Sequence, residues 1–375
     1  RYKQATTVSV SQAVAHPIHL IDKLATSENA IRFFAINFFV EYAESDTGTI
    51  IDFTALDPES TIQYLMFNGV LQYDDVLTLD KGNYGYDLFK NGYDGFYLAD
   101  TGKFLSNAPS TQYARLTDYG TLPFFNFLPS SADGVANIVL TYYWDGGSST
   151  ETVVQSWTAG GVTNFTTPVF QYLLYFGAFP GNLQNWSTTF ASAITSGLTH
   201  YTVYANSDLA TTSQVTTIKI ICPNERGYEG IRLTWLNQWG VWDYYTFNMK
   251  STRSIGTKRI PYTQLGGTWN ESTFKISGYK GGKKNFRVNS TEKIKLNTDF
   301  VTEAEGVWFE ELINSPEVYI VNGFSTDATN TITNKYIEPV TLTTSSYVKK
   351  TIANDKLMQY TIEIEKSKMQ RTQAV

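Results

Sequence analysis

A run of aromatic residues at 231–248, IRLTWLNQWGVWDYYTFN, limits the folds open to this chain more than any other segment. The run holds three Trp, two Tyr and one Phe in eighteen residues, with a glycine near its centre. Aromatic side chains suit pleated, half-buried surfaces, and a glycine between two such stretches favours a turn. The sequence therefore predicts a β-hairpin in which Leu233 and Trp235, with Tyr244 or Phe247, fill a core.

The composition supports the same fold class across the whole chain. The 375 residues include 25 Tyr, 23 Phe and 8 Trp, so aromatics make up 15%. Charged residues reach only 17%, below the roughly 25% of a typical soluble protein. A surface this low in charge is typical of a protein that neighbouring subunits cover. We predict a mainly β protein with two or three β-sandwich-like domains and one short helix near 303–315.

Three β-rich segments follow one another along the sequence. We predict an N-terminal β domain at 1–118, a nearly uncharged β-sandwich domain at 119–222, and a C-terminal β domain at 223–375. The middle segment contains the clearest hairpin, where Asp145-Gly146-Gly147 separates two β-rich runs within 137–157. The last segment holds the aromatic hairpin and the short helix.

The helix prediction depends on the segment EAEGVWFEELINS at 303–315. Trp308 and Leu312 are four residues apart and share one face, and Phe309 lies beside them. Glutamates lie early in the segment, where the helix dipole favours them. Pro316 ends the helix, because the residue before a proline is disfavoured in the α conformation.

The net charge of −6 is unevenly distributed. Residues 1–222 carry nine basic and nineteen acidic side chains, whereas residues 223–375 carry twenty basic and sixteen acidic ones. Opposite charges in the two parts favour head-to-tail contacts between copies, or an acidic neighbour. The basic excess is too small to indicate nucleic acid. The basic, Gly-rich stretch at 275–286 is predicted to be a solvated turn, with anion contact as the weaker alternative.

No catalytic, nucleotide or metal motif is present in the sequence. GxxxxGK[ST], strand-linked GxGxxG, HExxH and GxSxG are all absent. The three His include His16 and His19, and Cys222, the one cysteine, is predicted to be a buried hydrophobe. We therefore predict no catalytic residue, no cofactor and no metal. The apolar runs are also too short to cross a bilayer, so no membrane insertion is expected.

Acidic residues among aromatics leave one enzymatic alternative. The carboxylates are those of Asp74, Asp75, Asp94, Asp100 and Asp118. Glycosidases need two carboxyl groups roughly 5–9.5 Å apart, a spacing that sequence does not reveal. Aspartates beside glycines are more often turn formers, as in Asp94-Gly95.

Within the aromatic hairpin, the candidate interface residues are Trp239, Trp242, Tyr244 and Tyr245. Exposed Trp and Tyr side chains often anchor contacts between proteins. Two alternatives stay open for them. Aromatics in paired strands usually pack in a core, and an exposed ring can stack on a sugar.

Four segments occur in an order that points to a known group of proteins. They are KFLSNAPSTQYARLTDYGTLPFFN at 103–126, IRLTWLNQWGVWDYYTFNMKSTRS at 231–254, VWFEELINSPEVYIV at 307–321 and PVTLTTSSYVKKTIANDKLMQYTIEIE at 339–365. The series resembles virion structural proteins of tailed bacteriophages, of tail or baseplate type, from marine and Bacteroidota-infecting phages. The resemblance spans roughly 100–371, with a weaker N-terminal echo at 16–42. It implies β-sandwich domains and supplies no catalytic residues.

These observations lead to one main functional expectation. The protein is expected to be a non-enzymatic component of a phage tail, baseplate or fibre attachment, assembled in the host cytoplasm. Its expected partners are identical subunits in a ring or symmetric assembly and other virion proteins, without nucleic acid. The alternative is a receptor- or carbohydrate-binding protein at the tail tip that recognises a host surface glycan. A polysaccharide-degrading enzyme is the weakest alternative.

Overall fold

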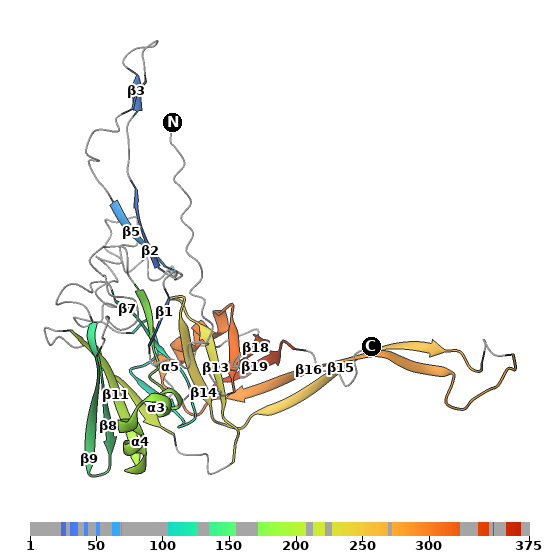
Figure 1. Ribbon diagram of the computed structural model, residues 1–375. Helices are drawn as coiled ribbons and strands as arrows, with labels where there is room; N and C mark the ends of the chain where they lie inside the picture. The colour runs from blue at the N-terminus through green and yellow to red at the C-terminus, as the bar shows by residue number, and fades with distance from the viewer. Residues whose placement is uncertain are drawn as a thin grey trace. The chain divides into compact units, whose positions relative to one another are not determined.

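The computed structural model shows a mainly β protein (Figure 1). It describes residues 24–27, 31–36, 41–43, 50–52, 62–67, 69, 104–126, 135–154, 172–207, 213–221, 227–268, 272–322, 337–344, 348 and 358–368. The described strands form five sheets, and three short helices accompany them. The predicted mainly β, sandwich-like fold is confirmed. Several predictions fall outside the described residues: those on His16, His19, Asp74, Asp75, Asp94, Asp100 and Cys222.

The chain divides into two compact units, which we describe separately. The first comprises Arg1–Cys222, Leu236–Tyr245 and Gly323–Asn334, and the second comprises Pro223–Trp235, Thr246–Asn322 and Lys335–Val375. The second unit begins at the residue where the third predicted domain begins. The three-domain organisation itself stays a prediction.

Three small sheets in the first unit include the N-terminal strands. β2 (Ile31–Ile36) pairs with β5 (Ile62–Phe67), and β3 (Glu41–Ala43) pairs with β4 (Ile50–Asp52). The third sheet has the order β1-β10-β7, with β1 (Leu24–Ser27), β10 (Tyr172–Phe176) and β7 (Leu122–Asn126). All of these pairs are antiparallel. Leu174 and Phe124 are opposite each other and fully buried, so they join this sheet to the core.

A five-stranded sheet in the first unit has the order β6-β12-β11-β8-β9. Its strands are β6 (Thr111–Ala114), β8 (Val135–Trp144), β9 (Gly147–Val154), β11 (Leu198–Ser207) and β12 (Thr216–Ile220). Trp144 lies opposite Gly147, so a two-residue turn joins β8 to β9, and Gly146 has a φ of +85° there. A two-residue hairpin turn favours residues that tolerate positive φ. The predicted Asp-Gly hairpin is therefore confirmed.

Two short helices, α3 (Pro180–Trp186) and α4 (Thr188–Thr195), pack in the first unit and were not predicted. The Phe190 ring of α4 lies 5.4 Å from the Tyr142 ring and 5.7 Å from the Tyr201 ring, between ring centroids. Ser187 caps α4 by accepting a hydrogen bond from the Phe190 N–H. Neither helix has an acidic first turn or a basic last turn. The charge signals that usually mark helix ends are therefore absent.

The largest sheet has seven strands in the order β14-β13-β17-β18-β19-β16-β15. Its strands are β13 (Ile231–Leu236), β14 (Trp242–Phe247), β15 (Thr252–Gln264), β16 (Gly282–Asn297), β17 (Val318–Val321), β18 (Ile337–Leu342) and β19 (Thr361–Lys366). On β19, Ile362 and Ile364 are fully buried while Glu363 and Glu365 are half-buried. This alternation is what a strand with one covered face requires.

The predicted helix near 303–315 is confirmed as α5 (Glu303–Asn314). A capping box fixes its start, because the side chains of Thr302 and Glu305 each accept a hydrogen bond from the other residue's backbone N–H. Trp308, Phe309 and Leu312 are buried, as their shared face predicts. Among the described residues, no helix is long and apolar enough to cross a membrane.

Candidate functional site

The predicted aromatic hairpin is confirmed as β13, a tight turn and β14. Asn237 organises the turn: its Oδ1 accepts hydrogen bonds from the N–H groups of Trp239 (3.0 Å) and Val241 (3.2 Å). Its Nδ2 donates to the Leu105 carbonyl oxygen at 2.9 Å. Gly240 has a φ of +71°, which glycine adopts without strain. The sequence analysis missed the role of Asn237, although an asparagine before a turn is a known turn former.

The four candidate interface residues differ in how far they are exposed. Trp242 is 3% exposed and Tyr244 is 4% exposed, whereas Trp239 and Tyr245 are half-buried. The Tyr244 hydroxyl lies 3.2 Å from that of Thr121. Trp242 and Tyr244 therefore pack within the chain, because the residues around the hairpin cover both faces of β14. The interface hypothesis narrows to Trp239 and Tyr245.

Tyr244 belongs to an aromatic cluster inside the first unit. Its ring centroid lies 5.8 Å from that of Phe179. Burial raises the pKa of the Tyr175 hydroxyl well above its ordinary value, and the nearby Tyr244 adds to the rise. Both effects keep Tyr175 neutral at any physiological pH. The cluster is therefore a packed interior and offers no general base.

The Trp239 side chain is the sharpest test of the hairpin as an interface. We expect Trp239→Ala to lower the free energy of unfolding by less than the about 3–5 kcal/mol of a core Trp deletion, because the side chain is half-buried. We expect the same variant to weaken self-association, measured by sedimentation velocity. The matched comparison is Trp242→Ala, which should lower stability more. Equal losses of stability in the two variants would contradict an interface role for Trp239.

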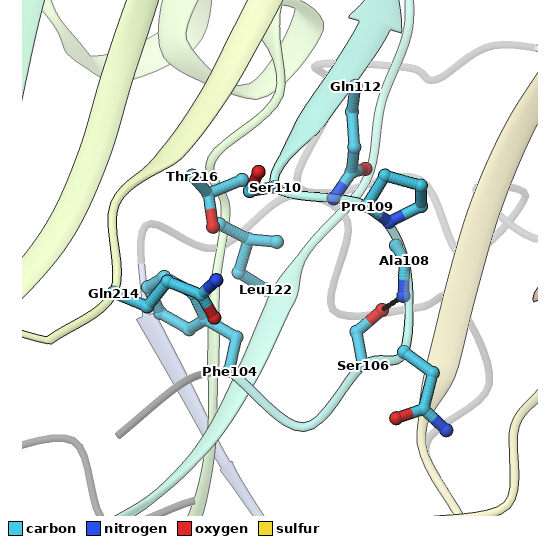
Figure 2. A pocket seen from close by; sticks show the side chains of 10 residues that line it. Phe104, Ser106, Ala108, Pro109, Ser110, Gln112, Leu122, Gln214 and Thr216 are labelled. Carbon is cyan, nitrogen blue, oxygen red and sulfur yellow. Dashed lines mark hydrogen bonds between the residues drawn. The ribbon is translucent and has the colours of Figure 1, made fainter. Parts of the chain in front are cut away.

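A pocket of about 260 Å³ lies in the first unit (Figure 2). Its lining consists of Phe104, Ser106, Asn107, Ala108, Pro109, Ser110, Gln112, Leu122, Gln214 and Thr216. Figure 2 shows Gln112 and Gln214 on opposite sides of the space. The lining offers three carboxamides and three hydroxyls but no ionisable side chain. It can hydrogen-bond a neutral polar ligand, and it supplies no acid or base for catalysis.

Asp118 is the one described residue among the carboxylates considered for an enzymatic cleft. It is 1% exposed, and its Oδ1 accepts hydrogen bonds from the Arg115 Nη2 (2.8 Å) and Nε (3.0 Å). Its Oδ2 accepts from the Arg115 backbone N–H. Asp118 thus closes a local turn as a paired, buried carboxylate. Within the described ranges, no group of three or more His, Cys, Asp or Glu is placed to hold a metal ion.

The most unusual surface of the second unit is a long β-ribbon. β16 pairs with β19 only over residues 293–297. In contrast, every residue of β15 pairs with a residue of β16. The ribbon therefore runs beyond the other strands of its sheet (Figure 1). We call residues 255–292 the arm, because Ile255 and Glu292 are the paired residues at its base. Every residue of β15 from Thr252 to Thr263 is exposed.

The arm concentrates the exposed apolar residues of the described chain. Fourteen large apolar side chains are exposed in total. Nine of them belong to the arm: Ile255, Ile260, Tyr262, Leu265, Phe274, Ile276, Tyr279, Phe286 and Val288. Ile276 is 81% exposed and Tyr279 is 74% exposed. Exposed apolar surface on this scale marks an interaction site in soluble proteins.

The described residues at the end of the arm, 265–268 and 272–281, contain the first part of the predicted basic turn, and the rest of that stretch belongs to β16. Thr268 holds two parts of the loop together, since its N–H donates to the Lys275 carbonyl oxygen and its Oγ1 accepts from the Lys275 N–H. Gly267 has a φ of +87°, and a Cβ there would clash with the Phe274 ring. Lys284 Nζ donates to the Tyr279 carbonyl oxygen at 2.8 Å. These contacts fix the backbone conformation of the described residues that carry the exposed apolar side chains.

Comparisons with protein-family models, with curated proteins and with solved structures gave no match to this chain.

Proposed function

We propose that this protein is a non-enzymatic structural subunit of a tailed-phage particle. Its place would be the tail, the baseplate or a fibre attachment, and it would act through repeated contacts between subunits. The exposure of nine large apolar side chains on the arm is the observation that carries the proposal. The ordered segments that resemble phage virion proteins supply the kind of particle.

The arm supports a role in assembly because a two-stranded ribbon gains little from itself. An isolated hairpin is at best marginally stable in water, and further packing is what usually secures it. Here Ile255, Ile260 and Val288 are exposed although β-branched side chains pack well in covered sheets. A neighbouring subunit would cover these side chains in the assembled particle. Repetition of one such contact around a rotation axis closes a ring.

The test is to locate the protein in purified particles. An antibody raised against the full chain, detected by immunogold electron microscopy, is expected to label the tail or baseplate region. Quantitative mass spectrometry of the same particles should give a copy number of the chain that is a multiple of the rotational symmetry of the tail. Absence of the protein from washed particles would overturn the proposal.

The neutral pocket favours one alternative function, a carbohydrate-binding protein at the tail tip. Carboxamides and hydroxyls hydrogen-bond sugar hydroxyls, and Phe104 lies in the same lining. A glycan array probed with the full chain would detect this activity. Binding that is lost in Gln112→Ala and Gln214→Ala, two residues on opposite sides of the pocket, would favour the alternative.

A further inference from the structure

We infer that the arm of one copy docks on the acidic first 222 residues of a second copy. This inference rests on the proposed structural function and names the partner surface. The docking face is the side of the ribbon that carries Lys258, Ile260, Tyr262, Lys284 and Arg287. Three steps support it: the charge of the arm, the arrangement of its face, and the chemistry of its apolar side chains.

The arm is a basic segment in an otherwise acidic protein. Residues 255–292 contain seven basic and two acidic side chains, while the rest of the chain contains twenty-two basic and thirty-three acidic ones. Residues 1–222 carry nine basic and nineteen acidic side chains. Complementary charge of this kind steers association and fixes which surfaces meet. A second copy of the chain therefore supplies, in the sequence of its first 222 residues, the excess of acidic side chains that complements the charge of the arm.

The described cations of the arm have no carboxylate partner, although Lys284 Nζ donates to the Tyr279 carbonyl oxygen and Arg287 Nε donates to Asn289 Oδ1. These cations are Lys258, Arg259, Lys275, Lys280, Lys283, Lys284 and Arg287, and within the described part of the chain none of them pairs with a carboxylate. At the base of the ribbon the pattern is different. Arg253 contacts Glu229 (2.7 Å) and Glu292 (3.2 Å), and Lys293 contacts Glu363 and Glu365. The ion pairs of the second unit thus end where the arm begins.

The register of the ribbon places cations and apolar residues on one face. Ile260 is opposite Arg287, and Tyr262 is opposite Lys284. Lys258, Ile260 and Tyr262 alternate along β15, so their side chains point to the same side as those cross-strand partners. The opposite face carries Arg259, which is paired with Val288, and Lys283, which is paired with Thr263. The first face therefore combines three cations with two large apolar side chains.

The apolar side chains favour a protein over a nucleic acid or a lipid surface. Single-stranded nucleic acids bind cations and flat rings, and the aliphatic side chain of Ile260 would gain nothing from that contact. A membrane would take up only the tip, whereas Ile260, opposite Arg287, lies about midway along the paired strands. A protein surface can cover an aliphatic side chain at that position. Pro261 and the irregular register beside it also discourage pairing at the strand edge, so docking through a face is favoured.

Photocrosslinking of the full chain tests the inference. A benzophenone amino acid replaces Tyr262, and equal amounts of ¹⁵N-labelled and unlabelled protein are mixed before irradiation. We expect crosslinks between labelled and unlabelled chains that map to residues 1–222. Their yield should fall as salt rises from about 0.05 M to about 0.5 M, because exposed charges are screened. Crosslinks within one chain only, crosslinks to 223–375, or no crosslinks would each overturn the inference.

Charge reversal on the two faces supplies a matched pair of variants. Lys258→Glu with Arg287→Glu changes the docking face, and Arg259→Glu with Lys283→Glu makes the same change of charge on the opposite face. We expect the first pair to weaken self-association roughly ten- to a hundredfold and the second pair to weaken it less. Unchanged thermal unfolding would show that both variants fold. Equal weakening would overturn the assignment of the face. If the arm does not make these contacts but the protein is still found in purified particles, the inference fails and the proposed function stands.

Discussion

Shortening the arm is expected to abolish self-association while leaving the fold intact. The variant replaces residues 257–290 with Asn-Gly, so that a two-residue turn joins Gly256 to Thr291. These two residues are directly opposite each other in the ribbon, and Asn-Gly is the preferred sequence for such a turn. The removed residues of β15 are exposed except for the half-buried Gln264, so few packing contacts are lost with them. We expect the free energy of unfolding to change by about 1 kcal/mol or less.

Two measurements on the shortened variant separate assembly from folding. Urea denaturation monitored by Trp fluorescence gives stability, and sedimentation velocity gives the oligomeric state. Val348→Ser is the control, because Val348 is an exposed apolar residue outside the arm, at 69% exposure. That variant should behave like the natural chain in both measurements. A shortened variant that associates as strongly as the natural chain would contradict the role given to the arm.

The Trp235→Ala substitution is expected to cause the largest loss of stability. Trp235 is fully buried, and its ring centroid lies 4.9 Å from that of Trp308 on α5. Trp308 in turn stacks on Phe309 with centroids 5.7 Å apart. Removal of a buried Trp ring leaves a cavity and costs about 3–5 kcal/mol. Loss of this contact would also loosen α5 from the sheet.

Chemical denaturation measures this effect directly. Trp235→Phe should recover part of the lost stability, because a smaller ring still fills part of the space. Ile276→Ala is the control on the arm, since Ile276 is 81% exposed. A loss below about 1 kcal/mol for Trp235→Ala would show that the core closes around the deletion.

The elements that sequence predicted correctly have strong local signals. The β8–β9 turn has Asp-Gly, and α5 has Glu residues in its first turn and Pro316 after its end. Each signal depends on residues within a few positions of one another. Helices α3 and α4 carry only weak local signals, Pro180 at the start of α3 and the Ser187 cap of α4, and neither has charged ends. Packing of Phe190 against the five-stranded sheet positions α4. No local pattern records that contact.

Alternation along a strand predicts burial only when one face of a sheet is covered. All six residues of β13 are buried, and so are five of the six in β14, which explains why Trp242 and Tyr244 are enclosed despite their place beside a turn. The arm shows the opposite case, because both of its faces are exposed. In both regions the chain gives no alternating pattern to read. The length of the arm and the burial of Trp242 and Tyr244 in the hairpin were therefore visible only in the three-dimensional structure.

The parallel pairing of β6 with β12 has a consequence during synthesis of the protein. Thr111 on β6 meets Thr217 on β12, and β6 has no other partner among the described strands. A ribosome that adds about 5–20 residues each second needs roughly 5–20 s to deliver the second strand after the first. During that interval the β8–β9 hairpin can already form, because its partners are adjacent in sequence. The nascent chain therefore waits with β6 unpaired. Because slower translation lengthens that wait, fast elongation or a ribosome-associated chaperone is favourable for its yield.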